Sequence, residues 1–242
     1  MPSSVLMRDF LDATRGAPAH PSLLKALARR AEDPGQALDL GCGAGRDSLQ
    51  LLAEGWTVTA LDQDVRALEI LREQAACYSP DKLATLCWTF EDVRSLPVVD
   101  FVNASFSLPF CQPEHFDELW RSISDSLGQG GWFSGHFFGP RDDWAAKGLT
   151  IHGREEVLKL FKGWSIDDFC EFERDGKTAV GTPKHWHLFE VVARRDSDAP
   201  LSLARCRWPS VLELIPPTMN AIDFDASQSG ARHARRTQPR PY

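Results

Sequence analysis

The chain has 242 residues, of which 43% are hydrophobic and 25% are charged, a composition typical of a globular protein with one sizeable core. Its 27 Lys and Arg against 34 Asp and Glu give a net charge of −7, so it lacks the overall positive charge that binds nucleic acid. The sequence holds no apolar run of about 18 residues, so no membrane-spanning helix is expected. The six scattered cysteines indicate free thiols in a cytoplasmic protein.

The first 34 residues are expected to form a helical cover that precedes the main sheet. Apolar side chains recur at helical spacing over residues 5–14 and again over residues 23–30. A stretch rich in Gly and Pro, residues 15–21, separates these two patches.

Residues 35–196 are expected to form the main domain, because short apolar runs alternate there with amphipathic ones. Strands are expected over residues 37–40, 57–61, 83–90, 98–105 and 132–138. Helices are expected over residues 47–54, 65–77 and 113–127. This alternation indicates βαβ units and a parallel sheet with helices on both faces.

Two more strands are expected over residues 164–174 and 186–194. The loop that joins them, residues 176–183, is too short for a parallel crossover, so the two strands should pair antiparallel. The predicted fold is therefore α/β: a Rossmann-like, seven-stranded, mostly parallel sheet with an antiparallel last strand. The remaining residues, 197–242, end in a polar, Arg-rich stretch and are expected to form a partly disordered extension.

A glycine-rich loop is the most informative segment of the chain. Residues 37–46 read Ala-Leu-Asp-Leu-Gly-Cys-Gly-Ala-Gly-Arg, so a strand runs into three glycines and then a helix. Glycine lets the backbone turn sharply and approach a ligand closely, and the helix start offers unpaired N–H groups. A nicotinamide fingerprint has its third glycine five residues after the first, whereas Gly45 follows Gly41 by four, which disfavours an oxidoreductase. With Asp39 upstream, the loop fits a ligand that carries an ammonium group.

Acidic residues also end the next two predicted strands. Asp62 closes the second strand, where a carboxylate can accept hydrogen bonds from both ribose hydroxyls. Glu91 and Asp92 follow the third strand, where an acid can accept from an adenine amino group, although a solvated turn explains them equally well.

Together these residues resemble the three cofactor motifs of class I S-adenosylmethionine-dependent methyltransferases. The resemblance implies S-adenosylmethionine as cofactor and S-adenosylhomocysteine as product. It places the methionine part at Asp39 and the loop glycines, the ribose at Asp62, and the adenine at Asp92 and Val93. The cofactor-binding residues that it implies are Asp39, Gly41, Cys42, Gly43, Gly45, Asp62, Gln63, Glu91, Asp92, Val93 and Ser105.

Four shorter motifs resemble one group within this class. These are Gly-Arg-Asp-Ser at 45–48, Phe-Phe-Gly-Pro-Arg-Asp-Asp-Trp at 137–144, Gly-Arg-Glu-Glu-Val at 153–157 and Pro-Lys-His-Trp-His at 183–187. They resemble the bacterial methyltransferases grouped with the tellurite-resistance and thiopurine enzymes.

The acceptor side of the site is less determined by the sequence. Phe106 and Phe110 follow the fourth strand and are expected either to wall the methyl-transfer pocket or to be ordinary core aromatics. Arg141, His185 and His187 are candidates for holding an anionic acceptor, or else surface residues. Strand alternation sends both histidines to one face and Trp186 to the other, and no third ligand for a metal is evident.

The sequence therefore predicts a methyltransferase that acts on a small molecule by direct in-line displacement, with no catalytic residue assigned. His136 fits a satisfied core histidine better than a base. The expected partners include neither nucleic acid nor membrane, and the protein is expected to be a monomer or a homodimer. The alternative is a catalytically silent sensor or scaffold that binds the same cofactor.

Overall fold

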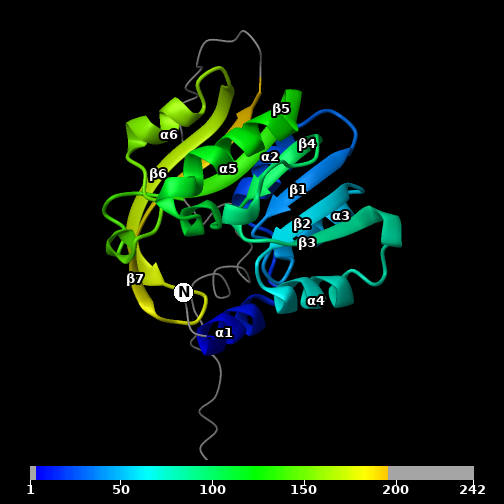
Figure 1. Cartoon of the computed structure of the whole chain (residues 1–242), viewed down its shortest axis with the longest axis horizontal. Helices are drawn as coiled ribbons and strands as arrows, with labels where there is room; N and C mark the ends of the chain where they lie inside the picture. The colour runs from blue at the N-terminus through cyan, green and yellow to red at the C-terminus, as the bar shows by residue number, and fades with distance from the viewer. Residues whose placement is uncertain (1–3, 196–242) are drawn as a thin grey trace, which may run out of the picture.

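A computed structural model describes residues 4–195 of the chain. Seven strands of this part form one sheet, shown in Figure 1: β1 (Gln36–Leu40), β2 (Thr57–Asp62), β3 (Leu83–Cys87), β4 (Val99–Ala104), β5 (Leu127–Phe138), β6 (Ser165–Lys177) and β7 (Pro183–Arg194). The helices within the same residues are α1 (Ser4–Thr14), α2 (Pro21–Arg29), α3 (Arg46–Ala53), α4 (Val65–Gln74), α5 (Pro113–Ser126) and α6 (Arg154–Leu160).

The strands lie in the order β3-β2-β1-β4-β5-β7-β6. Pairing is parallel from β3 to β5, whereas β7 pairs antiparallel with both β5 and β6. The predicted seven-stranded, mostly parallel α/β fold with an antiparallel last strand is confirmed.

The strands β6 and β7 form a long hairpin that reaches past β5. Pairing between β5 and β7 ends at Phe138 and Leu188, while residues 183–187 of β7 stay paired with β6. The hairpin tip therefore extends beyond the carboxyl end of β5.

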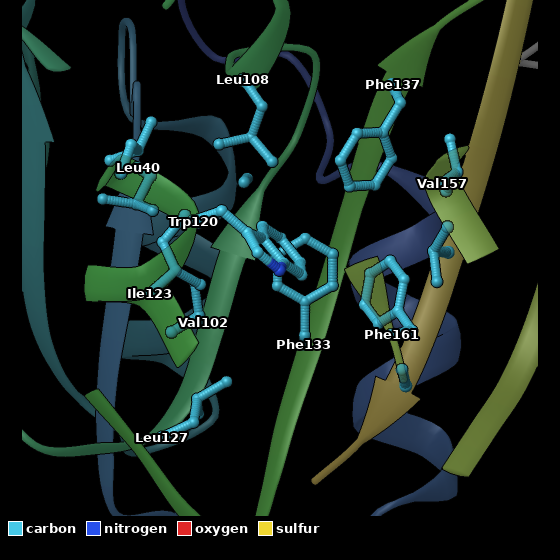
Figure 2. Packing of buried hydrophobic residues seen from close by; sticks show 14 of the residues in the cluster. Leu40, Val102, Leu108, Trp120, Ile123, Leu127, Phe133, Phe137, Val157 and Phe161 are labelled. Carbon is cyan, nitrogen blue, oxygen red and sulfur yellow. The ribbon is translucent and has the colours of Figure 1, made fainter. Parts of the chain in front are cut away.

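Helices cover both faces of the sheet, as Figure 1 shows with α5 in front of it and α2 behind it. On the α5 side, Trp120 packs edge-on against Phe133 and Phe161, with ring centroids 5.4 Å and 5.1 Å apart (Figure 2). On the other side, Leu23 of α2 and Leu68 of α4 belong to a second buried cluster. Burial of both faces agrees with β1 and β4, in which every residue but one is buried.

Two elements differ from the sequence prediction. The strand β5 begins at Leu127 rather than at residue 132. Gly130 and Gly131 belong to the strand because their backbone groups form hydrogen bonds with the backbone of Arg195. The helix α6 was not predicted, since it has seven residues and buries one side chain, Val157. Its start is fixed by the carboxylate of Glu156, which accepts the N–H of Gly153 at 2.6 Å.

The first helix lies beside α4 at the edge of the molecule (Figure 1). Leu11 of α1 is buried against Ala44 of the glycine loop and against Ala67 and Ile70 of α4. The division into a cover over residues 1–34 and a main domain over residues 35–196 stays a prediction. The predicted extension, residues 197–242, lies outside the described residues.

None of the helices within residues 4–195 combines the length and apolar character that a membrane crossing requires.

Candidate functional site

The candidate site lies at the carboxyl ends of β1, β2, β4 and β5. The strand order reverses between β1 and β4. From β1 the sheet is built outward on one side through β2 and β3, and on the other side β1 pairs with β4. In open α/β sheets such a reversal leaves a crevice beyond the strand ends, where ligands bind.

The glycine loop follows β1 and is held against the end of β2. The N–H groups of Gly41 and Cys42 both donate to the carbonyl of Leu61, at 2.7 Å and 3.0 Å. Gly41, with a φ of +69°, and Gly45, with a φ of +93°, adopt a backbone conformation that favours glycine. A Cβ at Gly45 would also lie 2.5 Å from Leu71 Cδ1, so the loop packs closely on α4.

Two buried carboxylates lie side by side at the end of β1 and the start of α3. The amide of Asn103 donates to both of them, at 2.9 Å to Asp39 and at 2.9 Å to Asp47. The hydroxyl of Ser48 donates to Asp39 at 2.5 Å. Since Asp39 and Asp47 are 2% and 3% exposed, their charges are shielded little by solvent.

The pKa values of the two carboxylates are shifted in opposite directions. Burial, and then the neighbouring charge of Asp47, raise the pKa of Asp39 to about 7. Burial also opposes ionisation of Asp47, but the charge and hydrogen bonds of His20 outweigh it and lower the pKa of Asp47 below its usual range. Asp39 is therefore a buried acid that a cationic ligand group would stabilise in its charged form.

The segment before α2 closes over the start of α3. His20 donates its backbone N–H to Asp47 at 2.8 Å, and its ring Nδ1 lies 2.9 Å from the same carboxylate. Arg46 Nε donates to the carbonyl of Pro18 at 2.6 Å. Sequence reasoning missed Asp47, Asn103 and His20, although Gly-Arg-Asp-Ser at 45–48 had marked the segment that holds Asp47.

Asp62 ends β2 beside the glycine loop. Its carboxylate accepts the N–H of Gly43 at 2.8 Å and that of Asp64 at 2.9 Å. Burial raises the pKa of Asp62, although these two backbone donors oppose that rise. The side chain of Gln63, the next residue, is exposed.

The predicted adenine segment forms a short 3-10 helix, Phe90–Asp92. The carboxylate of Asp92 caps this turn by accepting the Thr89 hydroxyl at 2.9 Å, and Glu91 accepts the N–H of Gln112 at 2.9 Å. Val93 is buried in the core on the α5 side. Cys42 is also buried, which raises the pKa of its thiol, and Ser105 donates to Asn103 Oδ1 at 3.2 Å.

Aromatic rings line the site beyond β4. Phe106 has a φ of +56°, a sparsely populated conformation for a non-glycine residue. Its ring stacks on that of His136, with centroids 4.0 Å apart and planes at 18°, and its centroid lies 6.0 Å from that of Trp186. Phe110 is 44% exposed and contacts Trp144, so neither phenylalanine is an ordinary core residue.

Behind the ring of Phe106 lies a buried polar network that no sequence pattern predicted. His136 Nε2 lies 3.4 Å from Glu190, which accepts from Lys25 Nζ at 2.5 Å. Lys25 also donates to Asp168 at 3.0 Å. The other ring nitrogen, Nδ1 of His136, is buried with no hydrogen-bond partner among residues 4–195. The choice between a core histidine and a base stays a prediction.

Arg141, His185 and His187 lie on the opposite face of the sheet from His136. His187 Nε2 lies 3.0 Å from Glu171, and Arg141 donates to Glu173 at 2.7 Å. The predicted alternation is confirmed, because Trp186 contacts Phe106 on the other face. A role for these three residues in holding an anionic acceptor stays a prediction.

Within residues 4–195, no group of three or more His, Cys, Asp or Glu side chains is placed to hold a metal ion. The carboxyl ends of the strands instead present carboxylates, backbone N–H groups and aromatic rings. These groups suit an organic ligand with a cationic part.

The comparisons with known proteins agree with the motifs. Residues 37–131 match a family model described as a methyltransferase domain. Solved structures of similar fold are S-adenosylmethionine-dependent methyltransferases, some of them with S-adenosylhomocysteine bound. No curated protein matches the chain in sequence.

Three solved structures illustrate the likeness. TehB from Haemophilus influenzae has a TM-score of 0.65 and 18% identity, and the match covers 74% of this chain and 63% of TehB. NodS from Bradyrhizobium japonicum, an N-methyltransferase solved with S-adenosylhomocysteine, has a TM-score of 0.61 and 13% identity over 79% of this chain and 97% of NodS. The Burkholderia thailandensis 1,6-didemethyltoxoflavin-N1-methyltransferase has a TM-score of 0.57 and 20% identity over 79% of this chain and 88% of that one.

The match to TehB spans less than two thirds of that protein. At these identities the three likenesses establish the fold.

Proposed function

We propose that this protein is an enzyme that transfers a methyl group from S-adenosylmethionine to a small-molecule acceptor by direct in-line displacement. One observation carries the proposal. Buried Asp39, the glycine loop and Asp62 lie together at the carboxyl ends of β1 and β2, beside the point where the strand order reverses. The toxoflavin enzyme, a neighbour in fold, was solved with a small-molecule acceptor and S-adenosylhomocysteine bound.

The residues present fit the cofactor. Asp39 is a buried carboxylate whose pKa is raised by burial and by the charge of Asp47, and the ammonium group of the methionine part would supply a positive partner for it. At Gly43 the nearest atom that a Cβ would meet is Phe10 Cε1 at 3.8 Å, an ordinary van der Waals contact, so no neighbouring atom crowds this glycine. In this proposal Asp62 would accept hydrogen bonds from the ribose hydroxyls, and residues 90–93 would contact adenine. S-adenosylmethionine, when bound, supplies an electrophilic methyl group on a sulfonium leaving group.

The protein's own contribution is to align the acceptor and exclude water. The aromatic rings of Phe106, Phe110 and Trp186 form the wall on the side where the acceptor would lie. We place the protein in the cytoplasm, as a monomer or homodimer without nucleic-acid or membrane partners.

Thermal unfolding of the purified protein with separate ligands tests the cofactor. S-adenosylhomocysteine at about 100 times its Kd is expected to add about 2.7 kcal/mol to the free energy of unfolding, and S-adenosylmethionine should do the same. NAD at equal concentration is the control and should leave the midpoint unchanged. A shift with NAD alone would contradict the proposal.

Replacing Asp62 by alanine is expected to weaken S-adenosylhomocysteine binding by about 1–3 kcal/mol, because the ribose hydroxyls lose a charged acceptor. This corresponds to a roughly 5- to 150-fold rise in the Kd measured by calorimetry. Asp100→Ala is a matched control, since Asp100 accepts a backbone N–H from Gln36 at the amino end of β4. Equal affinities of the wild type and the Asp62 variant would refute the role of Asp62.

Turnover separates the enzyme from a silent sensor or scaffold. Both would be stabilised by S-adenosylhomocysteine, whereas only the enzyme moves the methyl group of S-adenosylmethionine to another molecule. Transfer of radiolabelled methyl to a panel of small acceptors is the measurement that distinguishes them.

A further inference from the structure

His136 contacts both the acceptor wall, formed by Phe106, Phe110 and Trp186, and the buried polar network. It lies near the carboxyl end of β5, where the neighbouring pair Ala104 and Gly135 closes the β4–β5 register. One side of its ring stacks on Phe106, and its Nε2 lies 3.4 Å from Glu190. The histidine is 2% exposed and Glu190 is 4% exposed, so both are buried.

The ring has one nitrogen engaged and one without a partner. Glu190 is an ion-paired carboxylate, which accepts hydrogen bonds, so Nε2 of His136 carries the hydrogen. Nδ1 then holds a lone pair, and it is a buried atom without a hydrogen-bond partner among the described residues. Such an atom is costly to bury unless a ligand completes it.

The indole N–H of Trp186 is a second buried group without a partner in the described part of the chain. Trp186 contacts the same Phe106 ring edge-on, at 6.0 Å between centroids. Two side chains with an unpartnered polar atom, one an acceptor and one a donor, therefore contact Phe106. Because Phe106 holds a φ of +56°, it is also the member of the wall with a conformational reason to move.

The charges around His136 favour a proton arriving on its ring. Lys25 and Arg29 from α2 and the carboxylates of Asp167 and Asp168 on β6 and Glu190 on β7 together carry a charge of −1. His20 and Asp47 face the ring from the segment before α2 and from α3, with the two histidine centroids 6.0 Å apart. A proton on His136 would bring the Lys25 cluster to neutrality. Burial outweighs these charges and lowers the pKa of His136, so the ring is neutral at pH 7 and one of its nitrogens is an acceptor.

Resting on the proposed function, we infer that His136 is the catalytic base and that the acceptor is a planar molecule whose nucleophile carries an N–H or O–H. The acceptor displaces Phe106 and hydrogen-bonds to Nδ1 of His136 and to the indole N–H of Trp186. The nucleophile's electron pair forms the new bond to the methyl carbon, and the methyl–sulfur electron pair stays on the sulfur. The N–H or O–H proton passes to Nδ1, while Glu190 orients the ring through Nε2.

The test uses the full chain with radiolabelled S-adenosylmethionine and four probes: catechol, 4-nitrophenol, uracil and benzimidazole. At least one probe should be methylated. His136→Asn should lower kcat by about 10²- to 10⁴-fold and remove the acidic limb of the pH profile of kcat/KM. His152→Asn is the matched control, because His152 is partly buried against Phe116 and Phe137 away from this site, and it should keep wild-type kcat.

Two measurements keep the test decisive. Nitrogen NMR of the histidine side chains in the wild type should show the neutral Nε2–H form of His136 at pH 7, assigned by its loss in the Asn variant. The Nδ1–H form, or a charged ring at that pH, would overturn the assignment even if the variant failed to fold.

The thermal shift with S-adenosylhomocysteine separates this inference from the proposed function. A shift without methylation of any probe overturns the acceptor class and leaves the proposed function standing. A variant that folds, binds S-adenosylhomocysteine as the wild type does and keeps kcat within threefold overturns the role of His136. Absence of any shift in the wild type overturns the proposed function itself.

Discussion

Replacing Asp142 by alanine is expected to destabilise the protein by about 3–5 kcal/mol, because it leaves a buried ammonium group unpaired. Asp142 forms an ion pair with Lys184 in which the two side chains are 0% and 1% exposed. The same carboxylate accepts the backbone N–H groups of Trp144 at 2.9 Å and of His187 at 3.1 Å. It therefore ties the loop after β5 to the hairpin tip.

Aromatic rings surround the partner of Asp142. Lys184 Nζ lies 3.6 Å from the ring centroid of Trp186 and 4.6 Å from that of Trp144. These rings attract a cation but cannot replace a carboxylate, since burial lowers the pKa of Lys184 while Asp142 opposes that shift.

Urea unfolding of three variants checks this prediction. The double variant Asp142→Ala with Lys184→Met should be more stable than Asp142→Ala alone, because it removes the unpaired charge. Asp175→Ala is the exposed control: its carboxylate pairs with His185, but its side chain is 93% exposed, and the midpoint should barely move. A loss below about 1 kcal/mol for Asp142→Ala would contradict the assigned ion pair.

Replacing Asp39 by asparagine is expected to stabilise the protein at pH 8 while it weakens S-adenosylhomocysteine binding. The pKa of Asp39 is raised from 3.8 to about 7 by burial and by Asp47, so the folded state binds a proton more tightly than the unfolded state does. The wild type therefore loses stability as the pH rises from about 4 to about 7, by an amount on the order of 4 kcal/mol. Asparagine has no proton to lose and removes this dependence.

The two effects of Asp39→Asn are measured separately. Thermal unfolding from pH 4 to pH 8 should show that the stability of the variant rises relative to that of the wild type as the pH rises. Calorimetry should show a higher Kd of the variant for S-adenosylhomocysteine. Asp47→Asn should instead destabilise the protein at a pH above the usual pKa of an aspartate. The pairing with His20 lowers the pKa of Asp47, so the charged form of Asp47 stabilises the fold at that pH. A pH-independent difference between Asp39→Asn and the wild type would refute the buried charge.

Local patterns were sufficient to predict most of the fold. Short apolar runs and the spacing between them predicted the seven strands and the β6–β7 hairpin. The errors lie where tertiary contacts override local signals: Gly130 stays in β5 because the backbone of Arg195 pairs with it, a contact 65 residues along the chain. Helix α6 was missed because a seven-residue helix with one buried side chain has no periodicity to detect.

The candidate site was predictable where its residues share one motif. The loop glycines, Asp39 and Asp62 were all identified from their spacing, and the structure brings them together at one edge. The network at His136 was not predictable, since Lys25 and Glu190 are 165 residues apart and neither belongs to a motif. Only the sheet register places Glu190 opposite His136.

The β6–β7 hairpin has a consequence for how this fold can diversify. Residues 183–187 extend past β5 and pair with β6, so Trp186 reaches the acceptor wall from a segment that contributes nothing to the glycine loop. Substitutions at the hairpin tip can thus alter the shape and polarity of that wall while the edge formed by β1 and β2 keeps its geometry. Under the proposed function, acceptor choice and cofactor use would rest on separate parts of the chain, and selection could act on one while the other is conserved.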